Sequence, residues 1–236
     1  MQRVVCLVIG YLCGLIQTGY IVGKLKGVDI REHGSKNAGT TNILRTMGLK
    51  YGLICFAGDC LKCGLAILIT HFLFKDSYPD MLPLLKLYAA AGTILGHNYP
   101  CYLGFKGGKG IAATAGLVFF MFGPIMSFLG LATFFGIFFI THYVSLGSIC
   151  VYVGIIIDAF ILSKRGYWGE ATATQYFAEF NILIFLLALM AWWRHKDNIK
   201  RLLNGTERKT YLRGKPEIDV DAKNKNMIGS EEKNHG

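Results

Sequence analysis

The chain has 236 residues, of which 53% are hydrophobic and only 17% are charged, so it has too few polar residues to cover a soluble core of this size. The net charge is +10, but the basic residues flank apolar segments instead of forming one stripe with interleaved aromatic residues, which argues against a nucleic-acid partner. The 7 cysteines mostly lie inside apolar segments, and an odd number so placed predicts no disulfide framework.

Seven apolar segments follow one another along the chain, and most have the length of about 20 residues that a helix needs to cross a bilayer. The predicted spans cover 3–23, 51–74, 82–101, 111–123, 125–141, 146–163 and 176–193. The first is interpreted as a retained anchor, because it lacks a small-x-small cleavage site. Gly123 and Pro124 divide the fourth from the fifth, and these two segments could instead form one long kinked helix.

The distribution of positive charge decides between these readings. The segments 24–50, 105–110 and 194–236 hold 6, 2 and 11 of the 25 Lys and Arg residues, and they share one side only if 111–141 crosses twice. The positive-inside rule then places them in the cytoplasm and the N-terminus outside. We therefore predict an all-α integral membrane protein, a seven-transmembrane-helix bundle with a cytoplasmic C-terminus.

Two parts follow from this arrangement. Residues 1–210 form the predicted membrane domain, and 211–236 form a polar cytoplasmic tail. The tail has too few large apolar residues to fold by itself, so we expect it to be disordered from about residue 215.

The first cytoplasmic segment contains a polar motif at 33–45, with the sequence HGSKNAGTTNILR. Glycine allows close backbone approach, short hydroxyl and amide groups donate hydrogen bonds, and the arginine fork matches a phosphate group. The candidate phosphate-binding residues are Ser35, Asn37, Thr41, Asn42 and Arg45. The alternative is an ordinary polar turn that ends in a helix N-cap at Thr41 or Asn42.

A second motif joins GHNYP at 96–100 to FKGGKG at 105–110. A glycine-rich turn that opens a helix can present unpaired N–H groups to an anion, and two lysines add positive charge. The candidates are His97, Lys106, Gly107, Gly108, Lys109 and Gly110. The motif is not a P-loop, because Leu103 stands where the first glycine should be; a flexible basic loop is the alternative.

The third motif, at 194–207, has the sequence RHKDNIKRLLNGTE. On a helix, His195 and Asn198 share one face with Arg201 beside it, and Glu207 follows. The alternative is a juxtamembrane basic helix that binds anionic lipid.

The predicted topology places all three motifs at one membrane surface. The cationic candidates would repel one another unless an anion lay among them. They are Arg45, Lys106, Lys109, His195 and Arg201. The inferred ligand is a phosphate compound, and the adjacent hydrocarbon suggests a substrate with an acyl chain. No metal site is predicted, because no second pair or histidine cluster accompanies Cys60 and Cys63.

At these residues the sequence resembles the bacterial acyl-phosphate:glycerol-3-phosphate acyltransferases of the PlsY type, whose three signatures match at 34–45, 96–114 and 195–207. The resemblance covers residues 1 to about 210. One departure is Lys36, where the family often has glycine. The resemblance implies seven spans, no metal or nucleotide cofactor, and acyl transfer from acyl phosphate to the 1-hydroxyl of sn-glycerol 3-phosphate, giving lysophosphatidic acid and phosphate as the first acylation of phospholipid synthesis.

The resemblance also implies roles for the site residues. Ser35, Arg45, Lys109 and the turn 107–110 would bind phosphate groups, while His195 and Asn198 would orient substrate or donate to developing charge. It further implies that the protein lies in the bacterial cytoplasmic membrane. Its implied partners are membrane lipid and the soluble enzyme that makes acyl phosphate.

Three roles stay open from the sequence. The hydroxyl proton could pass to His195 or to a substrate phosphate, and Ser35 could be an acylated nucleophile, although no base lies near it in sequence. Asp59 and Lys62, three residues apart within a span, could pair with each other only, or Asp59 could support a cationic site residue. Glu207 is expected to support an arginine or the backbone.

Two rival functions need the same cations. A transporter of phosphate compounds usually places its site at the midplane between repeats, and no internal repeat is evident. A lipid-binding scaffold would have no need of the glycine-rich turn. The pattern His-x4-Asp at His71 and Asp76 falls on the opposite side of the predicted membrane and is interpreted as coincidence.

Overall fold

The computed structural model describes residues 1–212 and 214–220. These residues form α-helices and one short 3-10 helix, with no strand among them. The helices are α1 (Gln2–Gly14), α2 (Thr18–Leu25), α3 (Thr40–Met47), α4 (Leu49–Phe74), α5 (Leu82–Asn98), η1 (Cys101–Leu103), α6 (Ile111–Met121), α7 (Gly123–Thr141), α8 (Val144–Lys164), α9 (Glu170–Ala173), α10 (Phe177–Arg194) and α11 (Lys196–Leu203).

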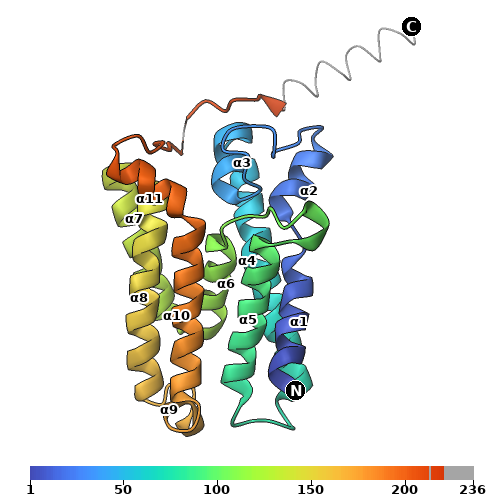
Figure 1. The fold of residues 1–236 in the computed structure, drawn as a ribbon, viewed down its shortest axis with the longest axis vertical. Coiled ribbons are helices and arrows are strands. Elements are labelled where there is room, and N and C mark those ends of the chain that lie inside the picture. Colours follow the sequence, from blue (N-terminus) through green and yellow to red (C-terminus); the bar gives the residue numbers. More distant parts are fainter. Residues whose placement is uncertain (213, 221–236) are drawn as a thin grey trace, which may run out of the picture.

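The long helices run side by side along the long axis of the molecule, with α1, α4 and α5 in one group and α7, α8 and α10 in another (Figure 1). The short helices α2, α3 and α11 lie at one end, and α9 lies at the other. Five helical segments are long and apolar enough to cross a membrane: α1 with α2, then α4, α7, α8 and α10. The all-helical membrane architecture is therefore confirmed, whereas the count of seven crossings and the orientation stay predictions.

The first predicted span is one segment in the sequence but two helices in the structure. The chain leaves the helix after Gly14 and resumes at Thr18. The carbonyl oxygens freed at this break are satisfied by buried polar side chains: Gln17 Nε2 donates to Gly14 O at 3.0 Å, and Lys62 Nζ donates to Ile16 O at 2.6 Å. Apolar periodicity contains no signal for such a break, because both halves are apolar and one of the two partners, Lys62, comes from another helix.

The segment 111–141 forms two helices that reverse direction. α6 starts beside the second motif, and α7 ends at Thr141, where His142 O accepts a hydrogen bond from Thr210 N at 2.9 Å. Thr210 also contacts Arg45, so both outer ends of this hairpin lie at the same end of the bundle. The reversal occurs at Gly123, whose φ is +80°, a value that glycine adopts without strain.

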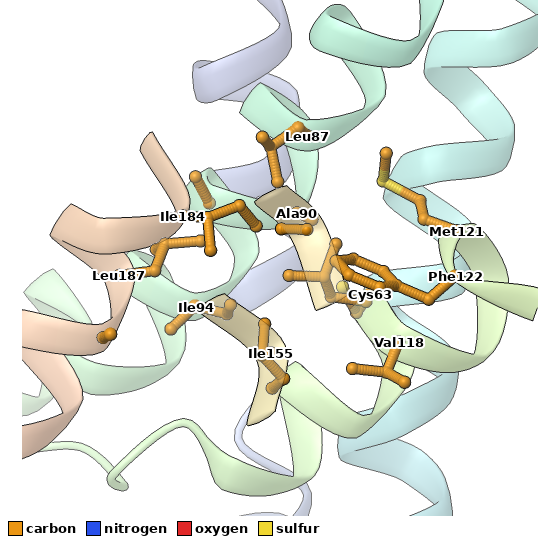
Figure 2. Packing of buried hydrophobic residues seen from close by; sticks show 14 of the residues in the cluster. Cys63, Leu87, Ala90, Ile94, Val118, Met121, Phe122, Ile155, Ile184 and Leu187 are labelled. Atoms are coloured by element: carbon orange, nitrogen blue, oxygen red, sulfur yellow. The ribbon is translucent and has the colours of Figure 1, made fainter. Parts of the chain in front are cut away.

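The main core lies between α4, α5, α6, α8 and α10, as Figure 2 shows. Small residues let some helices approach closely: a Cβ on Gly14 of α1 would lie 2.3 Å from Thr93 O of α5. Large apolar side chains also cover the outer surface, as lipid-facing helices require; among those exposed are Leu53, Leu61, Phe72, Ile125, Phe128, Ile140, Val153 and Ile157.

A smaller core packs α3 against α4 and the C-terminal segment. It contains Ile43, Met47 and Val220, with Ile218 against it. Glu217 N donates to Arg45 O at 3.2 Å, and Ile218 N donates to Thr46 O at 2.9 Å. Part of the tail that was expected to be disordered thus contacts α3, through these two backbone hydrogen bonds and the side chains of Ile218 and Val220. The rest of the predicted tail, 221–236, lies outside the described residues.

Candidate active site

A cavity of about 790 Å³ lies where the three motifs meet. Its polar end is lined by residues from all three motifs: Ser35, Asn37, Thr41, Asn42, Arg45, His97, Lys109, Gly110, His195, Asn198, Arg201 and Glu207. Its other end is apolar and extends between α4, α6, α7 and α8, where it is lined by Phe56, Val118, Phe119, Leu131, Phe134, Phe135, Val151 and Ile155. A cationic site and an apolar groove therefore form one continuous space.

The first motif forms a loop that Asn42 holds in place. The Asn42 side chain is buried, accepts a hydrogen bond from Ser35 N at 2.7 Å, and donates to Ile30 O and His33 O at 3.1 Å each. Its amide is occupied by the backbone, so Asn42 shapes the site more than it offers donors to a ligand. The Ser35 side chain, by contrast, is exposed and lines the cavity.

Lys36 has a backbone φ of +58°. This left-handed conformation costs a residue with a side chain about 1 kcal/mol and costs glycine nothing. The departure from the resembled family thus occurs at a position where the backbone geometry itself favours glycine.

The Arg45 guanidinium contacts the C-terminal segment. Nε donates to Thr210 Oγ1 at 2.8 Å, and Nη2 donates to Thr210 Oγ1 at 2.5 Å and to Arg208 O at 3.0 Å. Burial lowers the pKa of Arg45 from its usual value, although an arginine stays protonated at any physiological pH. Nothing in the local sequence around Thr210 indicated this contact.

The glycine pair of the second motif differs from the expected cradle of free N–H groups. Gly107 N donates to Asn98 O at 3.2 Å, and Gly108 N donates to His97 O at 3.0 Å. The carbonyl oxygens of both glycines accept from Arg194 Nη2, at 3.0 and 2.7 Å. In this structure the pair fastens the loop to α5 and α10.

The end of this motif does face the cavity. Lys109 and Gly110 line it, and α6 begins at the next residue, so the unpaired N–H groups of the first turn of α6 lie beside it. Burial lowers the pKa of Lys109 to about 8. Lys106 is exposed and is not among the described residues that line the cavity.

The third motif forms a polar network around Glu207. The carboxylate accepts from Asn198 Nδ2 at 2.7 Å, Arg201 Nε at 2.7 Å and Ser145 Oγ at 2.9 Å. Burial alone would raise the pKa of Glu207, but these three hydrogen bonds outweigh it and leave the pKa below its usual value. Asn198 Oδ1 in turn accepts a hydrogen bond from Lys109 Nζ. Glu207 thereby orients Asn198, which contacts the cavity lysine.

His195 is buried, with 3% of its surface exposed, and lies at the junction of α10 and α11. Its Nδ1 is 2.8 Å from Ala191 O. A carbonyl oxygen can only accept, so Nδ1 carries the proton and Nε2 has a free lone pair. Burial and the charge of Lys109 lower the pKa of His195 to about 4. The imidazole is therefore neutral at physiological pH.

Asn37 joins two of the motifs, and Asp59 pairs with a lysine of its own helix. Asn37 Nδ2 donates to Gly107 O at 3.3 Å, which joins the first motif to the second. Asp59 is fully buried and lies 2.7 Å from Lys62 Nζ.

The sequence indicated no role for Ser145, Arg194 or Thr210. Their contacts form only when separate segments of the chain are brought together.

Comparisons with known proteins identify the family to which the chain is similar. The sequence model of the family described as glycerol-3-phosphate acyltransferase matches residues 4–205. A glycerol-3-phosphate acyltransferase of Clostridioides difficile is 42% identical over 208 residues, which are 87% of this chain and 94% of the relative. One of Bacillus subtilis is 37% identical over 204 residues, which are 86% of this chain and 95% of the relative.

Two solved structures are also similar. A crystal structure of PlsY (YgiH), an integral membrane glycerol 3-phosphate acyltransferase in its glycerol 3-phosphate form, has 31% sequence identity and a TM-score of 0.74, covering 89% of this chain and 96% of that one. Its lysophosphatidic acid form gives a TM-score of 0.73 and covers 90% and 97%. The cavity, the motifs that surround it and these matches together show that the chain belongs to the glycerol-3-phosphate acyltransferase family.

Proposed function

We propose that this chain transfers a fatty acyl group from acyl phosphate to the 1-hydroxyl of sn-glycerol 3-phosphate, forming lysophosphatidic acid and phosphate. The observation that carries the proposal is the continuity of one cavity, cationic at one end and apolar at the other. Both substrates bear a phosphate group and one bears a long acyl chain, so a space of this kind can hold their reacting groups together.

The reaction needs no covalent enzyme intermediate. Acyl phosphate is an activated mixed anhydride: the glycerol oxygen attacks the carbonyl carbon, and the bond from that carbon to the phosphate oxygen breaks. Phosphate departs with the bonding electrons. Arg45, Lys109 and the N-terminus of α6 would stabilise the phosphate groups and the tetrahedral oxyanion. Ser35, which is exposed in the cavity, would donate a hydrogen bond.

We assign the hydroxyl proton to the departing phosphate rather than to His195. A base whose conjugate acid has a pKa of about 4 is poorly matched to neutral pH. The unprotonated Nε2 of His195 would accept a hydrogen bond from the attacking hydroxyl and orient it. Asn198, held between Lys109 and Glu207, would complete this arrangement.

The membrane arrangement completes the proposal. The helical segments α1 with α2, α4, α5, α6, α7, α8 and α10 would make seven crossings of a bacterial cytoplasmic (inner) membrane, within a domain of residues 1–210. The N-terminus would lie outside, and the cavity mouth would face the cytoplasm, where most of the positive charge lies. Acyl phosphate would then come from a soluble enzyme on that side, and membrane lipid would surround the helices.

The test supplies purified protein in detergent with palmitoyl phosphate and glycerol 3-phosphate. Release of lysophosphatidic acid and phosphate in equal amounts supports the proposal. Parallel reactions with palmitoyl-CoA and palmitoyl-acyl-carrier protein identify the donor. Absence of product with all three donors would refute an enzyme, and flux of glycerol 3-phosphate into proteoliposomes without product would favour a transporter.

Orientation has a separate test. Single cysteines at positions near 40, 108 and 200 should react with an impermeant maleimide only from the cytoplasmic face. Labelling of these positions from opposite faces would exclude a shared cavity.

A further inference from the structure

A buried polar cluster lies at the inner wall of the cavity. It contains Asp59 and Lys62 from α4 and His97 from α5, all of which are at most 3% exposed. Buried charges within a membrane helix are costly and are usually paired or functional. A mutual pair would satisfy Asp59 and Lys62, but Lys62 makes two further contacts that such a pair does not require.

Every N–H of the Lys62 ammonium has an acceptor in this cluster. Nζ lies 2.6 Å from Ile16 O, 2.7 Å from Asp59 Oδ1 and 2.9 Å from His97 Nδ1. An ammonium group has three donors and no acceptor. His97 Nδ1 must therefore accept, and the ring proton of the neutral imidazole must lie on Nε2.

The position of Asp59 supports the same tautomer. Its Oδ1 is 3.6 Å from His97 Nδ1, beyond hydrogen-bond distance, so it does not compete with Lys62 for that nitrogen. Thr18 Oγ1 donates to the same carboxylate oxygen at 3.1 Å. The carboxylate holds Lys62 in place, and Lys62 sets the orientation of the ring.

The opposite edge of the ring lies against Gly108. A Cβ on Gly108 would lie 1.9 Å from Nε2, so this edge packs against a glycine beside the proposed phosphate site, and His97 is among the residues that line the cavity. Within residues 1–212 and 214–220, Nε2 has no hydrogen-bond partner. Nε2 is therefore a donor that a ligand in the cavity can use.

We propose that Lys62 is a positioning residue that holds His97 in the Nε2–H form, so that His97 donates a hydrogen bond to a phosphate oxygen of a substrate. The inference rests on the proposed function and deepens it. The two histidines then have opposite hydrogen-bonding roles: His97 Nε2 donates a hydrogen bond, whereas His195 Nε2 accepts one. No proton is transferred by His97.

The first experiment tests the tautomer in the wild-type protein. Nitrogen-15 NMR of histidine-labelled protein in nanodiscs, with His97→Phe used for assignment, should show a protonated Nε2 and an unprotonated Nδ1. Addition of inorganic phosphate should shift the Nε2–H signal. A proton on Nδ1, or an Nε2–H signal that phosphate leaves unchanged, would overturn the inference, and neither result depends on turnover.

The second experiment compares variants by steady-state kinetics. The paired change Asp59→Asn with Lys62→Met removes both charges together, so no unpaired ion is left in the helix. Loss of one hydrogen bond to a charged group should raise KM for a phosphate substrate about tenfold, with a smaller effect on kcat. Separate KM values for glycerol 3-phosphate and palmitoyl phosphate identify which phosphate His97 contacts. Thr70→Val, a buried change in α4 away from the cavity, is the control.

A coupling measurement separates positioning from general destabilisation. If Lys62 acts through His97, adding the Asp59→Asn and Lys62→Met pair to His97→Phe should raise KM by less than twofold more. Full additivity of the two effects, or an unchanged KM in the pair alone, would refute the role of Lys62. A wild-type protein that makes no lysophosphatidic acid would refute the proposed function instead, and if the paired variant does not fold, the NMR result decides.

Discussion

Replacing Gly108 with alanine distinguishes two roles for the glycine pair. In this structure the N–H of Gly108 is donated to His97 O, and its Cα packs against the His97 ring. The φ of Gly108 is not in the left-handed region, so the backbone itself accepts alanine. The only new contact is the added methyl group, which would lie 1.9 Å from His97 Nε2.

The size of the effect follows from that distance. Ordinary contacts of a Cβ atom begin at 3.4 Å, so the ring must move by about 1.5 Å. Because Nδ1 lies on the opposite edge of the ring, only 2.9 Å from Lys62 Nζ, this movement would press the ring against Lys62 and force it out of its present hydrogen bond. Losing a hydrogen bond with a charged partner costs about 1.5–3 kcal/mol, which lowers kcat/KM by about 10-fold to 100-fold.

The assay measures lysophosphatidic acid formation in detergent over a range of glycerol 3-phosphate concentrations. Gly154→Ala in α8 is the matched control, because a Cβ there meets nothing within 4 Å and the residue does not line the cavity. Both variants should elute as the wild type does in size-exclusion chromatography. If kcat/KM of Gly108→Ala stays within about twofold of that of Gly154→Ala, the contact with the His97 ring does not affect catalysis, and the close-packing explanation is refuted.

Four other predictions concern polar residues at the cavity. Lys109→Ala and Arg45→Ala should each abolish turnover while the protein elutes normally; near-normal activity of either would count against the site. Lys36→Gly should raise the melting temperature or leave it unchanged, since the φ of +58° no longer costs about 1 kcal/mol. Lys36→Ala keeps this backbone strain and is the control. A clear fall in the melting temperature of Lys36→Gly would contradict the prediction. Because the pKa of Lys109 is about 8 and its protonated form binds phosphate, kcat/KM should fall above about pH 8. The pKa of His195 near 4 predicts no inflection between pH 6 and 7, and an inflection there that disappears in His195→Gln would show that this residue titrates.

Much of the architecture could be predicted because bilayer thickness sets the length of apolar segments. The hairpin of α6 and α7 followed from charge alone, since the basic loops share a side only if 111–141 crosses twice. The break between α1 and α2 could not be predicted. It depends on Gln17 and Lys62, whose side chains donate to the carbonyl groups left free at the break. Hydropathy does not indicate which polar side chain will reach these carbonyl groups.

The motifs predicted which segments meet, but not what each atom does there. Gly107 and Gly108 suggested free N–H groups, yet these bind the end of α5. Lys106 was grouped with Lys109 by sequence, although one is exposed and the other lines the cavity. The tautomers of His97 and His195 depend on Lys62 and on a helix carbonyl, and only the folded chain brings these partners within reach.

The contacts of Arg45 with Thr210 and Arg208 have a practical consequence for protein engineering. The family match ends at residue 205, so trimming the chain to that length would look harmless in an alignment. Such trimming would remove Glu207 together with both acceptors of the Arg45 guanidinium. An affinity tag or fluorescent fusion is therefore better attached after residue 220 than in place of the segment before it.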